Sequence, residues 1–381
     1  MSMAAVAASF LAWSFPSFGV LRKGFDSPSR LDFGTFAVLA AWYLLIFLSF
    51  GVGEMAGALR LRKSTLHSRL LDLHSNMIYY AFTVLSALGV GATLISVFRS
   101  LTLQQAAAAI VLGSANDLRN ALYEDYSIGF ASLRYVVVLS GSIALYKVIR
   151  FRQFAVLNLL NILLMLMGVV ISSRLMFIAT LVTLVFLLSF DKPSLRVSIP
   201  KLVFIAALIF LILAVLNYSR NKGFYERNKQ SFLEAGASEI LAYLGSPFQV
   251  AVGTTHVTDR IIGGDPDSYR DYIDIEKVLM TNSAFFHLHQ QMGYFSWLYV
   301  SLVCVFTGFV FETLASFGQT VFLLPCGAIL YGSVELWRLD LFQQGIFIVW
   351  FVIGIGLPLF LFSVQRFARF LGSSLRTSPS S

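Results

Sequence analysis

The chain has 381 residues, of which 57% are hydrophobic and only 13% are charged, and its formal net charge is +8. Soluble domains carry roughly 25% charged residues, so this composition excludes an ordinary soluble protein. The basic residues lie in short segments between apolar runs, where they orient helices in a bilayer. The positive charge therefore gives no reason to expect a nucleic-acid partner.

Apolar runs long enough to cross a hydrocarbon core of ~30 Å recur along the whole chain. They predict an all-α, polytopic transmembrane helix bundle of about ten spans. The chain then divides into seven spans within 1–217, a long loop at 218–292, three spans within 293–365, and a tail at 366–381. The expected spans are 3–21, 33–57, 77–98, 128–146, 154–171, 174–190, 202–217, 293–312, 320–334 and 342–363.

Basic residues are distributed unequally between the two sides of this bundle. They concentrate on the side that carries the tail, in the segments 60–69, 147–152, 192–201 and 366–376. Because short cytoplasmic loops are enriched in Lys and Arg, this pattern places both termini in the cytoplasm and the loop 218–292 outside. The basic linker 22–30 is the one feature that argues against this orientation.

Arg174 is the strongest candidate for a role in catalysis and substrate binding. It follows Ser172 and Ser173 and stands at the N-terminus of an apolar run, on the outer side of the predicted topology. A helix N-terminus presents unpaired N–H groups and favours an anion, and a guanidinium there suits a phosphate or diphosphate. The alternative is an arginine that only anchors the helix at the lipid headgroups.

Further arginines fall on the same outer side. Arg119 is a candidate for substrate binding, or a solvated arginine paired with Asp117. Arg338 is a second candidate, or an interface anchor beside Trp337. Arg134 lies just inside the fourth expected span, where a charge is expected to face the bundle interior or a wet cavity.

The long loop begins with a basic stretch that contains aromatic residues. Arg220 and Arg227 in this stretch suit an anionic headgroup or a diphosphate, and a solvated charged helix is the alternative. Later in the loop, Asp265 and Asp267 flank a proline after two glycines, which favours a turn over a metal site. We therefore expect neither a metal nor another cofactor.

Two histidines close the long loop. His287 and His289 are two residues apart, so a helix would place them on different faces, which is poor for joint metal ligation. Either could act as a general base near neutral pH, or be an interfacial histidine bonded to the backbone. We select His287 as the catalytic base, because it lies closer to Asn282, a candidate for substrate binding.

The order of these features resembles the Wzy-type O-antigen polymerases, which join oligosaccharide repeat units in bacterial envelopes. The family often shows an acidic-aromatic-glycine sequence where this chain has Gln291, Met292 and Gly293, and an Arg-Gly-Asp-like sequence where Leu339 replaces the glycine. The matching segments are Asp26-Ser27-Pro28, Leu118-Arg119, Ser173-Arg174, Thr281-Asn282, Gln291-Met292-Gly293 and Trp337-Arg338-Leu339-Asp340.

This resemblance implies a bundle similar to the GT-C type of membrane glycosyltransferase, located in the bacterial inner membrane. The implied activity is transfer of a growing glycan from undecaprenyl diphosphate to a fresh lipid-linked repeat unit at the periplasmic face. The implied partners are undecaprenyl-diphosphate-linked oligosaccharides, inner-membrane lipids and a chain-length regulator. Two alternatives remain open: a related O-antigen ligase that uses the same donor, and a transporter or flippase for a lipid-linked saccharide.

Overall fold

The computed structural model describes residues 2–14, 31–61, 76–111, 118, 121–122, 130–172, 175–191, 207–208, 210–215, 218, 222, 225–226, 231–264, 282–317 and 320–376. All regular secondary structure in these ranges is helical. The elements are α1 (Ser2–Ser14), α2 (Phe33–Leu61), α3 (Asn76–Ser100), α4 (Leu103–Val111), η2 (Phe130–Val136), α6 (Val137–Phe151), α7 (Val156–Ile171), α8 (Leu175–Asp191), α10 (Phe232–His256), α11 (Thr258–Ile261), α13 (Ala284–Met292), α14 (Phe295–Ser316), α15 (Thr320–Glu335), η3 (Leu341–Gln343) and α16 (Gly345–Arg376).

Five of the described helices are long and apolar enough to cross a membrane, in agreement with the prediction of a helical membrane protein. They match five of the expected spans: α2, α3, the continuous helix formed by η2 and α6, α14, and the first part of α16. The fourth span differs from expectation at Phe130–Val136, which form a 3-10 helix.

Four expected spans correspond to shorter apolar helices. These are α1, α7, α8 and α15, and α7 has 16 residues. Sixteen helical residues measure about 24 Å, which is less than a ~30 Å hydrocarbon core. Half of the expected span 202–217 falls outside the described residues, so the number of ten spans stays a prediction.

Helices α2 and α14 approach one another backbone to backbone. A Cβ on Gly53 of α2 would collide with the Val305 carbonyl of α14, and a Cβ on Gly308 would collide with the Phe50 carbonyl. Small residues at such positions let two membrane helices approach backbone to backbone. Gly57 lies near Glu312, further along both helices, so the two helices run in the same direction.

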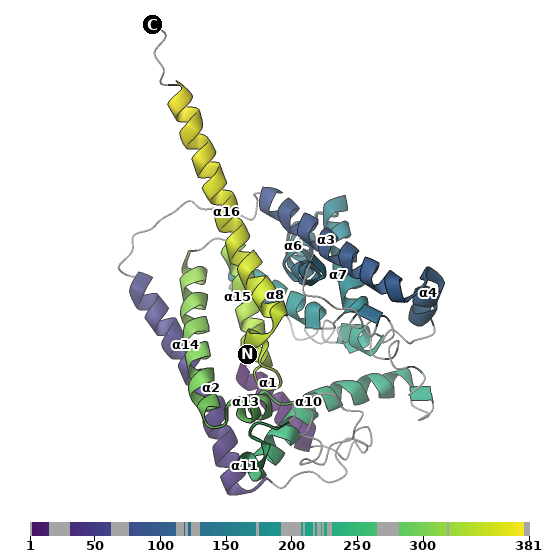
Figure 1. Ribbon diagram of the computed structural model, residues 1–381, viewed down its shortest axis with the longest axis vertical. Helices are drawn as coiled ribbons and strands as arrows, with labels where there is room; N and C mark the ends of the chain where they lie inside the picture. Colours follow the sequence, from purple (N-terminus) through teal and green to yellow (C-terminus); the bar gives the residue numbers. More distant parts are fainter. Residues whose placement is uncertain are drawn as a thin grey trace.

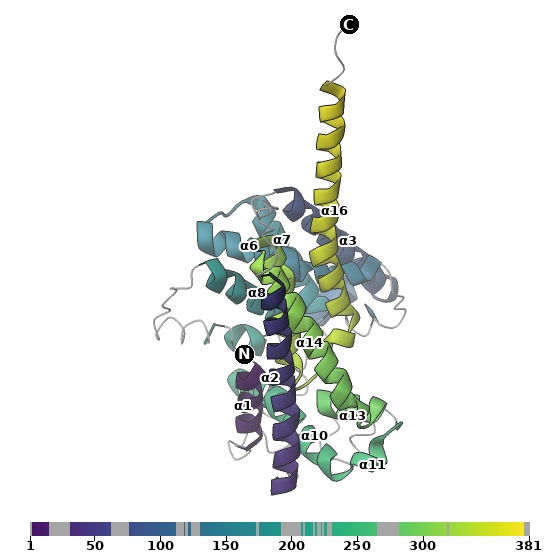
Figure 2. The same cartoon turned by 90° about the vertical axis from the view of Figure 1, so that its left-hand side faces the viewer.

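Three of the helices between the predicted spans, α10, α11 and α13, lie toward one end of the molecule (Figure 1). Figures 1 and 2 show α11 and α13 at the end opposite the C-terminus, with α10 beside them, and α16 projecting beyond the other helices at the C-terminal end. The loop predicted at 218–292 therefore contains three helices among its described residues. Three large hydrophobic clusters pack the described helices together. The first unites α3, α6, α8 and α15, the second unites α1, α2, α10, α13 and α14, and the third unites α6, α7, α8, α15 and α16.

The N-terminal helix is attached to this end by polar contacts as well as packing. Ser9 donates to the Leu244 carbonyl of α10 at 2.6 Å, and the indole N–H of Trp13 donates to Gln249 Oε1 at 2.6 Å. The N-terminus of α10 is stabilised by a capping box between Ser231 and Glu234. These contacts fix α10 across the end of the bundle that carries the candidate site.

Candidate active site

Helix α13 presents one apolar face and one polar face. Phe285 and Leu288 are buried, and the ring of Phe285 packs edge-on against Trp42 of α2 with centroids 5.0 Å apart. His287 and Gln291 are one turn apart and lie on the opposite, polar face. Gly293 ends the helix with a positive φ of 56°, which glycine adopts without strain, so that α14 begins two residues later.

His287 is half-buried on the polar face of α13. Its Nε2 lies 3.0 Å from the amide nitrogen of Gln291. An amide nitrogen can only donate, so the contact fits a neutral imidazole whose Nε2 accepts. Burial lowers the pKa of His287, and the nearby charge of Asp340 partly opposes this shift. The ring is therefore suited to accept a proton near neutral pH.

Asp340 is buried between α15 and η3 and comes from a different part of the chain. Its Oδ1 accepts the Phe342 backbone N–H at 3.0 Å and so caps η3, and its Oδ2 accepts the Tyr299 hydroxyl at 3.1 Å. Burial raises the pKa of Asp340, while these hydrogen bonds and the charge of His287 oppose the rise. The carboxyl thus links α14 to η3 by hydrogen bonds, and its charge acts on His287 of α13.

Arg338, two residues before Asp340, forms an ion pair with Glu335. Its Nε and Nη2 lie 2.9 and 2.8 Å from Glu335 Oε2, and its guanidinium lies 4.5 Å from the centre of the Tyr243 ring of α10. Burial would lower the pKa of Arg338, but Glu335, Tyr243 and Tyr331 together more than offset this effect and the pKa is raised. The predicted substrate-binding arginine is therefore charged, and a carboxylate already occupies it.

His289 faces away from this group, as the spacing of two residues predicted. It is almost fully buried and its ring packs against Phe285 and Tyr294. Burial lowers the pKa of His289, against the opposing effects of the Thr258 backbone and Asp259. Its surroundings are those of a packing residue beside α11.

Asn282 lies at the start of the same segment. Its side-chain oxygen accepts the Ser283 backbone N–H at 2.7 Å, and Ser283 in turn caps α13. Asn282 is partly exposed one turn before His287, so the structure places both predicted residues on one helix and its cap.

Arg134 is fully buried in η2 and faces the bundle interior, as the sequence predicted. Its Nε donates to Ser172 Oγ at 2.9 Å, its Nη1 to the Ala131 carbonyl at 2.8 Å, and its Nη2 to the Tyr135 hydroxyl at 2.7 Å. Through Ser172 it holds the C-terminal end of α7, immediately before Ser173 and Arg174 in the sequence.

Several predicted site residues fall outside the part of the chain that the structure describes. Of the substrate-binding candidates, these are Arg119, Arg174, Arg220 and Arg227. Asp265 and Asp267 also fall outside it. Among the described residues, no group of three His, Cys, Asp or Glu side chains is arranged to hold a metal ion.

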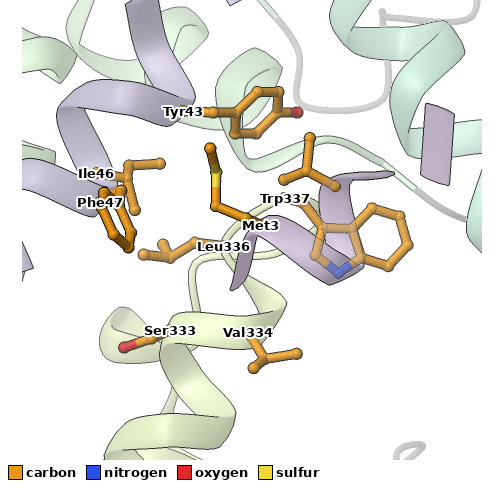
Figure 3. A pocket seen from close by; sticks show the side chains of 9 residues that line it. Met3, Tyr43, Ile46, Phe47, Ser333, Val334, Leu336 and Trp337 are labelled. Carbon is orange, nitrogen blue, oxygen red and sulfur yellow. The ribbon is translucent and has the colours of Figure 1, made fainter. Parts of the chain in front are cut away.

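An apolar groove lies next to the Glu335–Arg338 pair, between α1, α2 and the end of α15. Figure 3 shows Met3, Tyr43, Ile46 and Leu336 around it, with Trp337 forming a wall. The groove encloses about 10 Å³, room for one small group. It offers hydrocarbon contact rather than chemistry.

The structure thus brings His287, Asn282 and Arg338 to one end of the bundle and adds residues that sequence reasoning missed. The spacing of Glu335 and Arg338, three residues apart at a helix end, was a signal for their ion pair. Asp340 was visible only as part of a motif, and nothing in the sequence pairs Tyr243 with Arg338 or Tyr299 with Asp340. Their contacts span 41 residues or more.

This arrangement could accept a proton from a hydroxyl at His287 and hold a negative group near Arg338. The chain matches no protein-family model, and no match to it was found among curated proteins or solved structures.

Proposed function

We propose that this protein is a membrane glycosyltransferase that joins lipid-diphosphate-linked oligosaccharide repeat units into a surface polysaccharide. The observation that carries the proposal is a group of ionisable side chains at one end of the helical bundle. A neutral His287 lies near Asp340, and a charged Arg338 precedes Asp340 by two residues in the sequence. The resemblance in motif order to Wzy-type polymerases supplies the substrate class.

The chemistry needs few groups, because a sugar diphosphate already carries a good leaving group. A hydroxyl of the acceptor repeat attacks the anomeric carbon of the donor glycan, and the bond to the diphosphate oxygen breaks. His287 takes the hydroxyl proton, and undecaprenyl diphosphate leaves with the electron pair. Fixed positive charge from Arg338, together with Arg119, Arg174, Arg220 and Arg227 from the predicted outer segments, would stabilise the departing diphosphate.

The proposal places the site at the periplasmic face of a bacterial inner membrane, with both termini in the cytoplasm. The parallel direction of α2 and α14 is consistent with the predicted topology, which gives the second and eighth expected spans the same direction. The separation of α13 from the C-terminus along the molecule supports placing the two on opposite sides of the membrane (Figures 1 and 2). The distribution of basic residues is what assigns the outer side.

This orientation is tested by placing single cysteines in 225–275 and in 64–70 and treating whole cells with an impermeant thiol reagent. We expect labelling only in 225–275. The native Cys304 and Cys326 are both buried, so they should give little background. Reversed labelling would contradict the chemistry on the outer face.

The activity is tested by the glycan ladder of a deletion strain on a gel. Loss of a polymerase leaves single-repeat material on the cell surface. Loss of a ligase leaves long chains on the lipid carrier, and loss of a flippase leaves single repeats inside the cell. The polymerase proposal is wrong if the deletion strain still shows a normal ladder or gives either of the other two results.

A further inference from the structure

The ion pair between Glu335 and Arg338 is unusual in its burial. The Glu335 side chain is 5% exposed and that of Arg338 is 10% exposed. Removing two charges from water costs several kcal/mol per ion, and the attraction between them often only repays this cost. A pair of well-packed apolar side chains would serve stability at least as well, so the pair calls for another explanation.

Three donors are gathered around the Glu335 carboxylate. Arg338 donates through Nε, and the Tyr243 hydroxyl lies 3.5 Å from Oε1. The third is the Tyr331 hydroxyl, which is fully buried and makes no hydrogen bond of regular geometry among the described residues. It lies close enough to Glu335 for a weak hydrogen bond and also interacts electrostatically with Arg338. The donors form an anion site that the chain fills with its own carboxylate.

We propose that Glu335 is a displaceable counter-ion, and that a phosphate group of the lipid-linked substrate replaces it at Arg338. This inference rests on the proposed function and adds a gate to the same site. A phosphate presents more acceptor oxygens than a carboxylate, and the planar guanidinium can bind two of them at once. Phosphate can therefore satisfy Tyr331 as well as Arg338 and Tyr243.

Apolar side chains adjoin the ion pair: Leu336 and Trp337 stand between Glu335 and Arg338 in the sequence and line the small groove of Figure 3. A lipid-linked ligand could therefore bring its phosphate to the arginine while its nearest hydrocarbon groups contact these two side chains. While no such ligand is bound, Glu335 covers the guanidinium and keeps small anions away. The pair would then select lipid-linked phosphates over free phosphate.

The test measures binding of a C15 prenyl diphosphate to the full-length protein in detergent, with the prenyl alcohol and inorganic diphosphate as separate probes. Glu335→Gln should bind the prenyl diphosphate about tenfold more tightly than the wild type, because the competing charge is gone. It should also begin to bind inorganic diphosphate. Arg338→Gln and the double variant Glu335→Gln/Arg338→Gln should bind at least about tenfold more weakly than the wild type.

A matched control is Glu226→Gln, because Glu226 pairs with Lys222 at 3.7 Å on the exposed surface. It removes the same charge from the chain and should leave binding unchanged. Glu335→Asp keeps the charge but withdraws it by one methylene, and should tighten binding by a smaller factor. This variant serves if Glu335→Gln does not fold.

Three results would overturn the inference: no tighter binding in either Glu335 variant, equal tightening in Glu226→Gln, or tightening that survives the loss of Arg338. If the wild type binds the prenyl diphosphate and polymerises while the Glu335 variants bind no better, only the gate is wrong. If no variant binds the prenyl diphosphate, the gate and the proposed recognition of lipid diphosphate both fail.

Discussion

Two groups of buried polar side chains serve different ends in this protein. In the first, between α3 and α7, the Tyr79 hydroxyl donates to Asn158 Oδ1 at 2.8 Å, and the Asn161 amide donates to Tyr79 at 3.1 Å and to Thr83 at 2.8 Å. All four side chains are uncharged. Hydrogen bonds of this kind join membrane helices, and each contributes a modest stabilisation.

The second group lies at the end of the bundle and consists mainly of ionisable residues. His287, Asp340, Arg338 and Glu335 come from α13, α15 and the turn before η3. Burying charges and titratable groups is expensive, and their presence typically marks a functional site. The uncharged group holds helices together, and under the proposed function the ionisable group would carry the chemistry. The predictions below test that division.

The largest effect is expected at His287. Replacing it with alanine removes the proposed base and should lower the polymerisation rate by about 10²- to 10⁴-fold, with the protein still folded. The measurement is polymer formation from defined lipid-linked repeats by the purified enzyme. His289→Ala, at equal expression, should lower activity less. An equal or greater loss of activity in His289→Ala would show that His287 is not the base.

The uncharged group should affect stability instead. Tyr79→Phe removes the hydroxyl that joins α3 to α7 and should lower the free energy of unfolding by about 0.6–1.7 kcal/mol, with the activity per folded molecule unchanged. Unfolding in detergent measures this effect. Tyr80→Phe is the matched control, because the neighbouring Tyr80 is 54% exposed. Lost activity in folded Tyr79→Phe would contradict the division between the two groups.

A smaller effect is expected from Asp340→Asn on the pH dependence. The charge of Asp340 raises the pKa of His287, so removing it should lower that pKa further. A base is active when neutral, and activity is lost as the pH falls through its pKa. The acidic limb of kcat/KM should therefore move to lower pH. The asparagine oxygen can still cap η3, and its amide nitrogen can donate to the Tyr299 hydroxyl, so the fold should persist. A limb that stays in place or moves to higher pH would rule out this coupling.

The smallest effect, none, is expected from removing divalent metal. Arginine stays charged at physiological pH and can neutralise a diphosphate without a cation. Excess chelator should therefore leave polymerisation unchanged, and so should the double variant Asp265→Asn/Asp267→Asn. If chelator stops the reaction, magnesium or manganese restores it, and the double variant is inactive, the arginine mechanism is wrong.

Much of the fold followed from local patterns. The apolar runs that became α2, α3 and α14 were recognisable because hydropathy and helix length are properties of one continuous segment. The buried orientation of Arg134 was also predictable, since a charge within an apolar span has few other places to go. The helices within 218–292 were not predicted, because that segment lacks a long apolar run.

The sequence by itself determined that the chain is helical and suited to a membrane, and it identified His287 and Arg338 as residues of interest. Only the tertiary structure decided their partners. Tyr243 contacts Arg338, 95 residues further along the chain, and His287 is influenced by the charge of Asp340, 53 residues further along. Both pairs form because α10, α13 and the turn after α15 converge at one end of the bundle. Hydropathy is a property of consecutive residues, so the sequence alone reveals it. The partner of a buried charged side chain depends on which helices pack together, so only the tertiary structure reveals that partner.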